Sequence, residues 1–253
     1  MQLKSIRFAV AAAVLATLQA CGGGGGDGGS KSSALVADSS PEGAWGGTAL
    51  SNGETLDIVL VVLENGQYYG VYAQGGAAYG LLEGTGTGSR TSFSSSNGRD
   101  FGFGELEFSP FSLTATFTPK LSISGSATYS GFTSTFSANY DSTYETAASL
   151  SAIAGSYSGS AGSLEGNSTF TLTIDSSGAL AGTTSTGCQV SGSLSPRNST
   201  TAVFNLTVTY NSATCDTGVT VKGIAGRSGP NGLIFAATLP DRSDAFYAVA
   251  SRP

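Results

Sequence analysis

Histidine is absent from all 253 residues, and this absence removes much of the chemistry that proteins commonly use. Without imidazole the chain cannot build a histidine-ligated zinc site, a Ser-His-Asp triad or a histidine general base. The hydrolase elbow Gly-x-Ser-x-Gly and the motif Ser-x-x-Lys are missing as well. Only scattered carboxylates remain as candidate catalytic groups. We therefore expect a protein that is not an enzyme and that holds no metal and no cofactor.

Charged residues are scarce, at 11% of the chain. Beyond Lys4 and Arg7, nine basic residues face 17 acidic ones, and no basic cluster occurs. A negatively charged chain without a basic patch is a poor partner for nucleic acid, so we expect none. The charged run at 241–244, Asp-Arg-Ser-Asp, is typical of a polar turn before a strand.

Residues 1–20 are typical of a signal peptide. Lys4 and Arg7 give a positive start, and the apolar run of eleven residues that follows is too short to span a bilayer as a stable helix. The next residues, Leu18-Gln19-Ala20-Cys21, resemble the lipobox of bacterial lipoproteins. The resemblance implies cleavage before Cys21 and lipidation of that residue. Because Gly22, not aspartate, follows, it also implies the outer membrane. The alternative is a secreted protein with a stray thiol.

Residues 21–42 are rich in glycine and serine, with few apolar side chains. Such a segment cannot bury enough surface to offset its ordering entropy, so we expect a flexible tether between the lipid and the fold. If Cys21 carries lipid, Cys188 and Cys215 are the two cysteines left, in an oxidising compartment. We expect one disulfide between them, at one end of a meander of strands.

The rest of the chain contains an internal repeat whose two copies are related by a constant offset of 112 in the numbering. Five glycines and one aromatic position coincide without a gap, which predicts two tandem domains, 43–151 and 152–253. A later match of Gly125 with Gly223 implies a contraction of the second half. One large sandwich with coincidental glycines is the alternative. The ungapped pairs are Gly43/Gly155, Trp45/Tyr157, Gly66/Gly178, Gly70/Gly182, Gly75/Gly187 and Gly80/Gly192.

Each half alternates apolar residues with serine and threonine, which is the pattern of half-buried strands. The turn Glu64-Asn65-Gly66-Gln67 carries the Asn-Gly pair of tight hairpins. About eight short strands per half predict an all-β protein of two antiparallel up-and-down barrels, because closure removes exposed sheet edges. A β-sandwich is the alternative.

The start of the first domain, Gly43-Ala44-Trp45, resembles the G-x-W motif of lipocalins and related eight-stranded barrels. The resemblance implies that the tryptophan closes one end of the barrel and that a basic residue of the last strand packs on it. Gly155-Ser156-Tyr157 would be a degenerate copy, with Arg252 as the basic residue. The first domain offers no such arginine in 144–150. The architecture is also similar to the barrel domains of surface transferrin-binding lipoproteins.

Three hypotheses about function remain. The first is an outer-membrane lipoprotein without catalysis that binds a protein partner or acts as a scaffold in the cell envelope. The second is a lipocalin-like carrier of a small ligand, and the third is an enzyme that uses carboxylates alone. A large apolar cavity in either barrel would favour the second hypothesis, and filled interiors would favour the first. Four tyrosines are candidate ligand contacts: Tyr68, Tyr69, Tyr72 and Tyr79.

Overall fold

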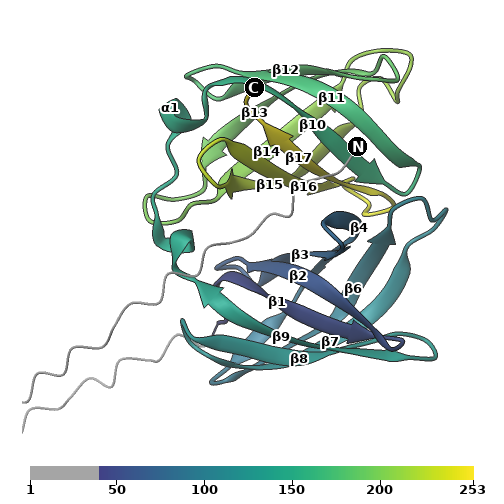
Figure 1. Cartoon of the computed structure of the whole chain (residues 1–253), viewed down its shortest axis with the longest axis vertical. Coiled ribbons are helices and arrows are strands. Elements are labelled where there is room, and N and C mark those ends of the chain that lie inside the picture. Colours follow the sequence, from purple (N-terminus) through teal and green to yellow (C-terminus); the bar gives the residue numbers. More distant parts are fainter. Residues whose placement is uncertain (1–39) are drawn as a thin grey trace, which may run out of the picture.

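A computed structural model describes residues 40–253. The predicted signal peptide, the lipidation site Cys21 and most of the predicted tether lie outside the described residues. Within 40–253 no helix is long and apolar enough to cross a membrane. The described chain folds into two antiparallel β-barrels joined by a short helical connection (Figure 1).

The first barrel is a ring of eight strands in which each strand pairs with the ring strands that precede and follow it along the chain. The ring closes between β1 and β9, and the short strand β5 pairs only with β6, so that β4 pairs directly with β6. The strands are β1 (Gly43–Ser51), β2 (Glu54–Val62), β3 (Gln67–Gln74), β4 (Ala77–Thr85), β5 (Thr87–Ser89), β6 (Ser92–Gly102), β7 (Ser109–Thr118), β8 (Ser122–Thr128) and β9 (Thr133–Asp141).

The second barrel repeats this ring with eight strands and closes between β10 and β17. Two short helices connect the barrels, η1 (Ser142–Glu145) and α1 (Leu150–Ile153), and the predicted boundary at residue 152 falls in α1. The strands are β10 (Gly155–Ser163), β11 (Gly166–Ile174), β12 (Ala179–Thr184), β13 (Gln189–Pro196), β14 (Phe204–Tyr210), β15 (Thr220–Ser228), β16 (Gly232–Thr238) and β17 (Ala245–Ser251).

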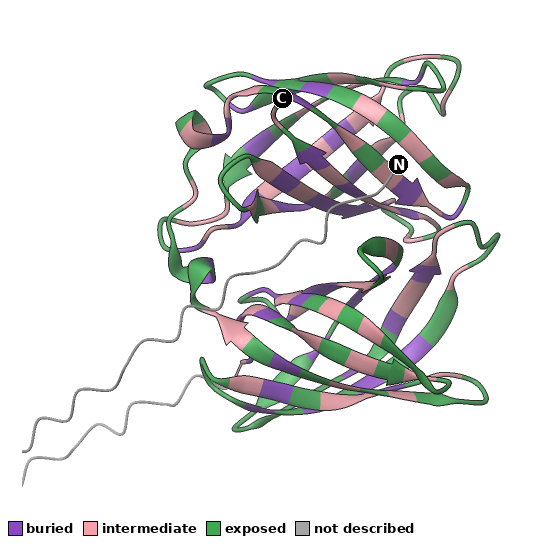
Figure 2. Ribbon diagram, viewed as in Figure 1, coloured by how far each residue is buried: buried purple, intermediate pink, exposed green. Residues whose placement is uncertain are grey.

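Alternating side chains produce the barrels. Along β7, Phe111, Leu113, Ala115 and Phe117 are buried, and the residues between them are exposed. Figure 2 shows the same alternation of buried and exposed residues along many strands of both barrels. Successive side chains of a strand point to opposite faces, so the apolar set fills the barrel and the Ser/Thr set faces outward. The prediction of two eight-stranded barrels is confirmed, and the sandwich alternative is wrong.

The offset of 112 also holds for the strand register. Gly43 pairs with Val62 in the first barrel, and Gly155 pairs with Ile174 in the second. At the closing strands Gly47 pairs with Ala138, and Gly159 pairs with Ala250 at the same offset. The number of residues from the first strand to the last is therefore the same in the two barrels.

The predicted match of Gly125 with Gly223 is wrong. Gly125 lies on β8, the seventh strand of its ring, whereas Gly223 lies on β15, the sixth strand of the other ring. In each barrel a glycine allows the sixth and seventh strands to approach closely. Gly125, on the seventh strand, lies against Ala115 on the sixth, whereas Gly223, on the sixth strand, lies against Ala237 on the seventh. The second half is therefore not contracted, because its last strand returns to the offset of 112.

One end of each barrel is closed by an aromatic side chain. Trp45 donates its Nε1 hydrogen to the carbonyl of Pro41 at 3.0 Å, and Tyr157 donates its hydroxyl to the carbonyl of Ile153 at 2.8 Å. Both the donors and the acceptors are related by the offset of the repeat, so the two ends are built in the same way. We call these the closed ends, and we call the opposite ends the mouths.

A second side chain at the closed end comes from the last strand of the first barrel and from the residue directly after the last strand of the second. The Arg252 guanidinium lies 5.2 Å from the centre of the Tyr157 ring, while the Tyr140 ring meets Trp45 edge-on at 5.2 Å. Residues 144–150 of the first half, which contain no arginine, form part of the helical connection and not a strand. The first barrel therefore uses Tyr140 in the place of Arg252, since positions 140 and 252 are related by the same offset.

The two barrels pack against each other through their outer faces. At the closed ends the Arg197 guanidinium contacts the Glu64 carboxylate at 2.7 Å, and near the mouths the Gly104 amide donates to the Ser163 carbonyl at 3.1 Å. Like ends are therefore adjacent, and both mouths open on the same side of the molecule. An apolar cluster fills the space between: Leu63, Tyr69, Leu81, Phe101 and Tyr144 meet Leu164, Val203, Ile224, Ala236 and Ala245.

Candidate ligand-binding site

The interior of the first barrel is occupied by its own aromatic side chains. The Tyr68 ring meets the rings of Phe93 and Phe111 at centroid distances of 6.1 and 6.5 Å. Glycines make room for these rings, since a Cβ on Gly84 would lie 2.4 Å from the Tyr68 hydroxyl oxygen. The first barrel is therefore a packed core with little room for a ligand.

A partly buried carboxylate stands near the mouth of this first barrel. Asp100 accepts hydrogen bonds from the hydroxyls of Tyr72 at 2.8 Å and Tyr129 at 2.9 Å. Burial raises the pKa of the Asp100 carboxyl, and the two tyrosine donors lower it in part. Both hydroxyls are committed to Asp100, so the trio satisfies itself and does not form an open site.

The second barrel is hollow. A cavity of about 470 Å³ extends from its mouth toward its closed end, within the size range of small-molecule pockets. Its inner part is apolar and continues into the core that fills the closed end. The inner lining includes Phe170, Leu172, Leu180, Leu206, Val208 and Phe235.

Two substitutions between the repeats contribute to the difference in filling. Tyr68 pairs with Val62, and Leu180 pairs with Ile174, so Tyr68 and Leu180 occupy equivalent interior positions. At the same offset, Tyr72 in the first barrel corresponds to Thr184 in the second. Leu180 and Thr184 both line the cavity, which thus lies where the first barrel holds two tyrosine rings.

The mouth of the second barrel carries three acidic residues, Glu165, Asp216 and Asp244, which we call the rim carboxylates. One oxygen of Asp244 accepts the backbone N–H of Ala245 at 2.7 Å, which fixes this side chain at the start of β17. Burial raises the pKa of the Tyr210 hydroxyl, also in the lining, to about 12, and the rim carboxylates add to the shift. The apolar cavity therefore ends in a negatively charged opening.

A disulfide shapes one side of the mouth. Cys188, just before β13, is bonded to Cys215 in the loop 211–219, and their Cα atoms are 5.4 Å apart. Both cysteines line the cavity, together with Thr214 of the same loop. The disulfide thus holds this loop beside the opening, and both cysteines lie at one end of the barrel.

The structure does not bring the four predicted tyrosines together. Tyr68 and Tyr72 point into the filled first barrel, whereas Tyr69 lies in the apolar cluster between the barrels. Tyr79 stays 50% exposed. These four candidate ligand contacts therefore do not share one surface, because adjacent residues of a strand face opposite ways.

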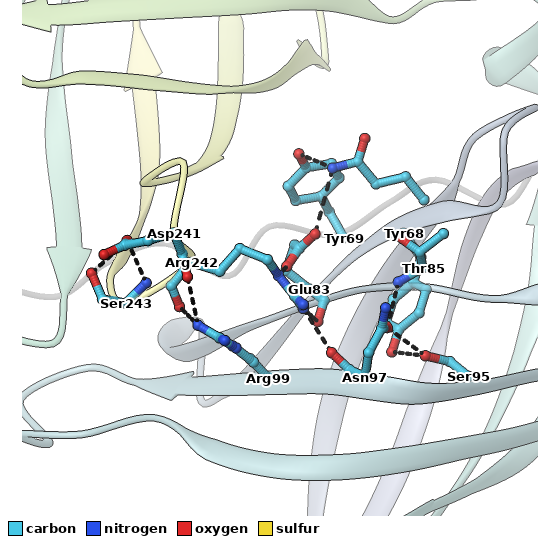
Figure 3. Close-up of polar contacts among 11 residues, drawn as sticks. Tyr68, Tyr69, Glu83, Thr85, Ser95, Asn97, Arg99, Asp241, Arg242 and Ser243 are labelled. Atoms are coloured by element: carbon cyan, nitrogen blue, oxygen red, sulfur yellow. Dashed lines mark hydrogen bonds and ion pairs between the residues drawn. The ribbon is translucent and has the colours of Figure 1, made fainter.

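The charged turn at 241–244 has a role that the sequence did not indicate. Arg242 reaches across to the first barrel, where its guanidinium pairs with the buried carboxylate of Glu83 and donates to the Asn97 carbonyl at 2.8 Å (Figure 3). In return the Arg99 guanidinium of the first barrel donates to the Asp241 carbonyl at 3.0 Å. This turn connects the barrels, and it also ends in the rim residue Asp244.

Within residues 40–253 no group of three or more cysteine, aspartate or glutamate side chains is placed to hold a metal ion. The cavity, apolar inside and acidic at its opening, can enclose an apolar body with a polar contact at the mouth.

No protein-family model matches the sequence, and no curated protein matches it. The solved structures that match part of the chain include the following two. One is a protein of unknown function from the DUF3598 family of Nostoc punctiforme, with 11% identity over 84% of this chain and 96% of that one and a TM-score of 0.30. The other is isotype 1 transferrin binding protein B of serogroup B Neisseria meningitidis, with 9% identity over 81% and 69% and a TM-score of 0.31. Similarity at this level identifies no family.

Proposed function

We propose that this protein is a non-catalytic binding protein whose second barrel encloses a small ligand. The cavity of about 470 Å³ carries the proposal, because it is apolar inside, opens at one end and lies in a fold whose other barrel is packed. This favours the small-ligand hypothesis over a pure partner-binding scaffold. The first barrel then acts as the support that holds the mouth of the second.

Enclosure provides the affinity in this proposal. A ligand that enters the cavity removes its own apolar surface and that of side chains such as Phe170 and Leu206 from water, at about 25 cal/mol per Å². The strands keep the walls in place without the ligand, so little ordering entropy opposes binding.

We also propose that the binding protein is an outer-membrane lipoprotein anchored through Cys21. The described chain enters the first barrel at the closed end, where Glu42 accepts a hydrogen bond from Tyr144 at 3.1 Å. The mouth of the second barrel is at the opposite end, so a tether at residue 42 would not obstruct it. Changing Cys21→Ser should release the protein from the membrane fraction, and continued membrane association would reject the anchor.

The cavity is tested with the chain from residue 22 onward, which keeps both barrels and the tether. The neutral dye N-phenylnaphthylamine, which fluoresces in apolar sites, should bind and give one site per chain. Thr184→Tyr should weaken dye binding by at least about tenfold, because it places in the second barrel the ring that Tyr72 places in the first. The double variant with Leu180→Tyr should abolish binding.

A matched control puts the same ring on the outer wall. Ser193 is exposed on β13, so Ser193→Tyr adds a tyrosine without entering the cavity. Dye binding should be unchanged in this variant. Equal binding by the Thr184→Tyr, Ser193→Tyr and unchanged proteins, or no dye binding at all, would reject the proposed function.

A further inference from the structure

We propose that the cavity of the second barrel selects a ligand with an apolar body and a positively charged group, such as an alkyl or aryl ammonium compound. This inference rests on the proposed function and names the ligand class of the same site. It follows from the order of side chains along the cavity, from the charges at its mouth and from one unused hydroxyl.

The first observation is that polarity changes along the cavity in one direction. The inner wall is made mainly of aliphatic and aromatic side chains, and the carboxylates stand only at the opening. A ligand that fits this gradient has one apolar end and one polar end. It enters with the apolar end first, and its head group stays among the rim carboxylates.

The second observation is the sign of the charge at the mouth. Among the described residues that line the cavity, three are acidic and none is lysine or arginine. Opposite charges attract and like charges repel across a few ångströms, more strongly beside a low-dielectric wall than in bulk water. An ammonium head group is therefore favoured at the rim, and a carboxylate or phosphate head group is disfavoured.

The nearby basic residue Arg242 does not change the negative sign of the charge at the mouth. Arg242 belongs to the same turn as Asp244, but its guanidinium is directed at Glu83 of the first barrel and at the Glu83 and Asn97 carbonyls. Figure 3 shows this side chain pointing from its turn toward the first barrel. Its charge is paired there with a buried carboxylate, so the negative charge of the rim is left uncompensated.

The third observation concerns aromatic side chains of the cavity wall. Tyr210, Phe170 and Phe246 line the cavity and are only partly buried. The Tyr210 hydroxyl makes no hydrogen bond within the described part of the chain, although all three rim carboxylates act on it. Aromatic faces attract cations, and an unpaired hydroxyl oxygen accepts an ammonium hydrogen. These groups would surround a cation with rings, an acceptor and opposite charge.

The test uses three probes with the same chain and different head groups: dodecylammonium, dodecanol and dodecanoate, each below its micelle concentration. Each probe competes with N-phenylnaphthylamine for the chain from residue 22 onward at pH 7. We expect dodecylammonium to bind at least about tenfold more tightly than dodecanoate, with dodecanol between them.

The rim is then neutralised by Glu165→Gln, Asp216→Asn and Asp244→Asn. The new amide at 244 keeps an oxygen for the Ala245 N–H, so the turn should stay folded. The preference for dodecylammonium over dodecanoate should fall to within about threefold, while dodecanol binds as before. A control triple variant, Glu54→Gln, Asp57→Asn and Glu107→Gln, changes the net charge equally at exposed positions of the first half and should keep the preference.

The outcomes separate the inference from the proposed function. If the dye and dodecanol bind but head-group charge makes no difference, or dodecanoate binds best, the ligand class is wrong and the cavity function stands. If the rim variant keeps the full preference, the rim carboxylates are not its cause and the inference is also wrong. If neither the dye nor any probe binds, the proposed function itself fails.

Discussion

The two barrels share one backbone plan but have different interiors. Their first strands have the same register, their closed ends use the same hydrogen bond, and their last strands are related by the same offset. Yet one interior is filled with aromatic rings, and the other contains a cavity. A barrel of eight strands has just enough room for its own side chains, so a few residue sizes decide whether it is solid or hollow.

The residue exchanges show how each interior is organised. Asp100 and Leu206 are equivalent, because Asp100 pairs with Leu82 and Leu206 pairs with Leu194. The first barrel thus surrounds its carboxylate with tyrosines, whereas the second has leucine at that position and keeps its carboxylates at the mouth. In the first barrel Asp100 and the tyrosines hydrogen-bond to one another, and in the second the rim carboxylates remain available to a ligand.

The largest effect is expected when the two barrels are separated. A fragment of residues 152–253 should fold, but it should be less stable than the same barrel in the whole chain by on the order of 5 kcal/mol. The reason is that Leu164, Ile224, Ala236 and Ala245 lose the partners that bury them. Urea unfolding of the fragment and of the whole chain measures the difference.

Two results would contradict this view of the interface. An unfolded fragment would show that 152–253 is not a separate domain, and an equally stable one would show that the interface contributes nothing. A fragment carrying Leu164→Ser and Ile224→Thr serves as the control. It should self-associate less than the unchanged fragment, because it exposes less apolar surface.

The disulfide gives the next largest effect, and it belongs to the hollow barrel alone. Replacing Cys188 and Cys215 by serine should lower the free energy of unfolding of the second barrel by about 3–4 kcal/mol, since the bond joins residues 27 apart. Dye binding should weaken as well, because the loop 211–219 is no longer held beside the opening. The unfolding transition of the first barrel should not move, and a shift of both transitions would contradict this assignment.

The fold was predictable from the sequence because its signals are local and repeated. Alternation of period two, the Asn-Gly turn at 65–66 and the glycines at a constant offset all report on strands and turns of a few residues. The same signals place two barrels in tandem. They do not report on packing between distant segments, such as Glu83 with Arg242, which are 159 residues apart.

The candidate site was not predicted, although one of its signals was present in the repeat. The offset that aligns the glycines also aligns Tyr68 with Leu180 and Tyr72 with Thr184, so the loss of two rings could have been noticed. Closeness in sequence does not bring the tyrosines together in space, because alternation sends Tyr68 and Tyr69 to opposite faces. Which loops carry the rim carboxylates to one mouth depends on closure of the ring, which the sequence shows only indirectly.

A smaller effect distinguishes the packed interior from the hollow one. Tyr68→Leu gives the first barrel the residue of the second, and it should cost about 2–3 kcal/mol, because it leaves a cavity and removes the hydroxyl that meets Ser95 at 3.2 Å. The reverse change, Leu180→Tyr, should cost about 1 kcal/mol or less, since the ring enters empty space. Urea unfolding measures both variants, and equal costs would show that the two interiors are packed alike.

The smallest expected effect is a change in the pH dependence of the first barrel. Burial raises the pKa of Asp100 in the folded protein above that of an unfolded aspartate, so between the two values the folded state binds more protons. Stability should therefore fall as pH rises through this window. Asp100→Asn removes the titrating group while its amide still pairs with Tyr72 and Tyr129. Its stability should fall less steeply with pH there than that of the unchanged protein, as measured by urea unfolding at several pH values. Identical slopes would show that Asp100 titrates alike in the folded and unfolded states. Enclosing its carboxyl group would then carry no cost in stability, and this contrast with Leu206 of the second barrel would be lost.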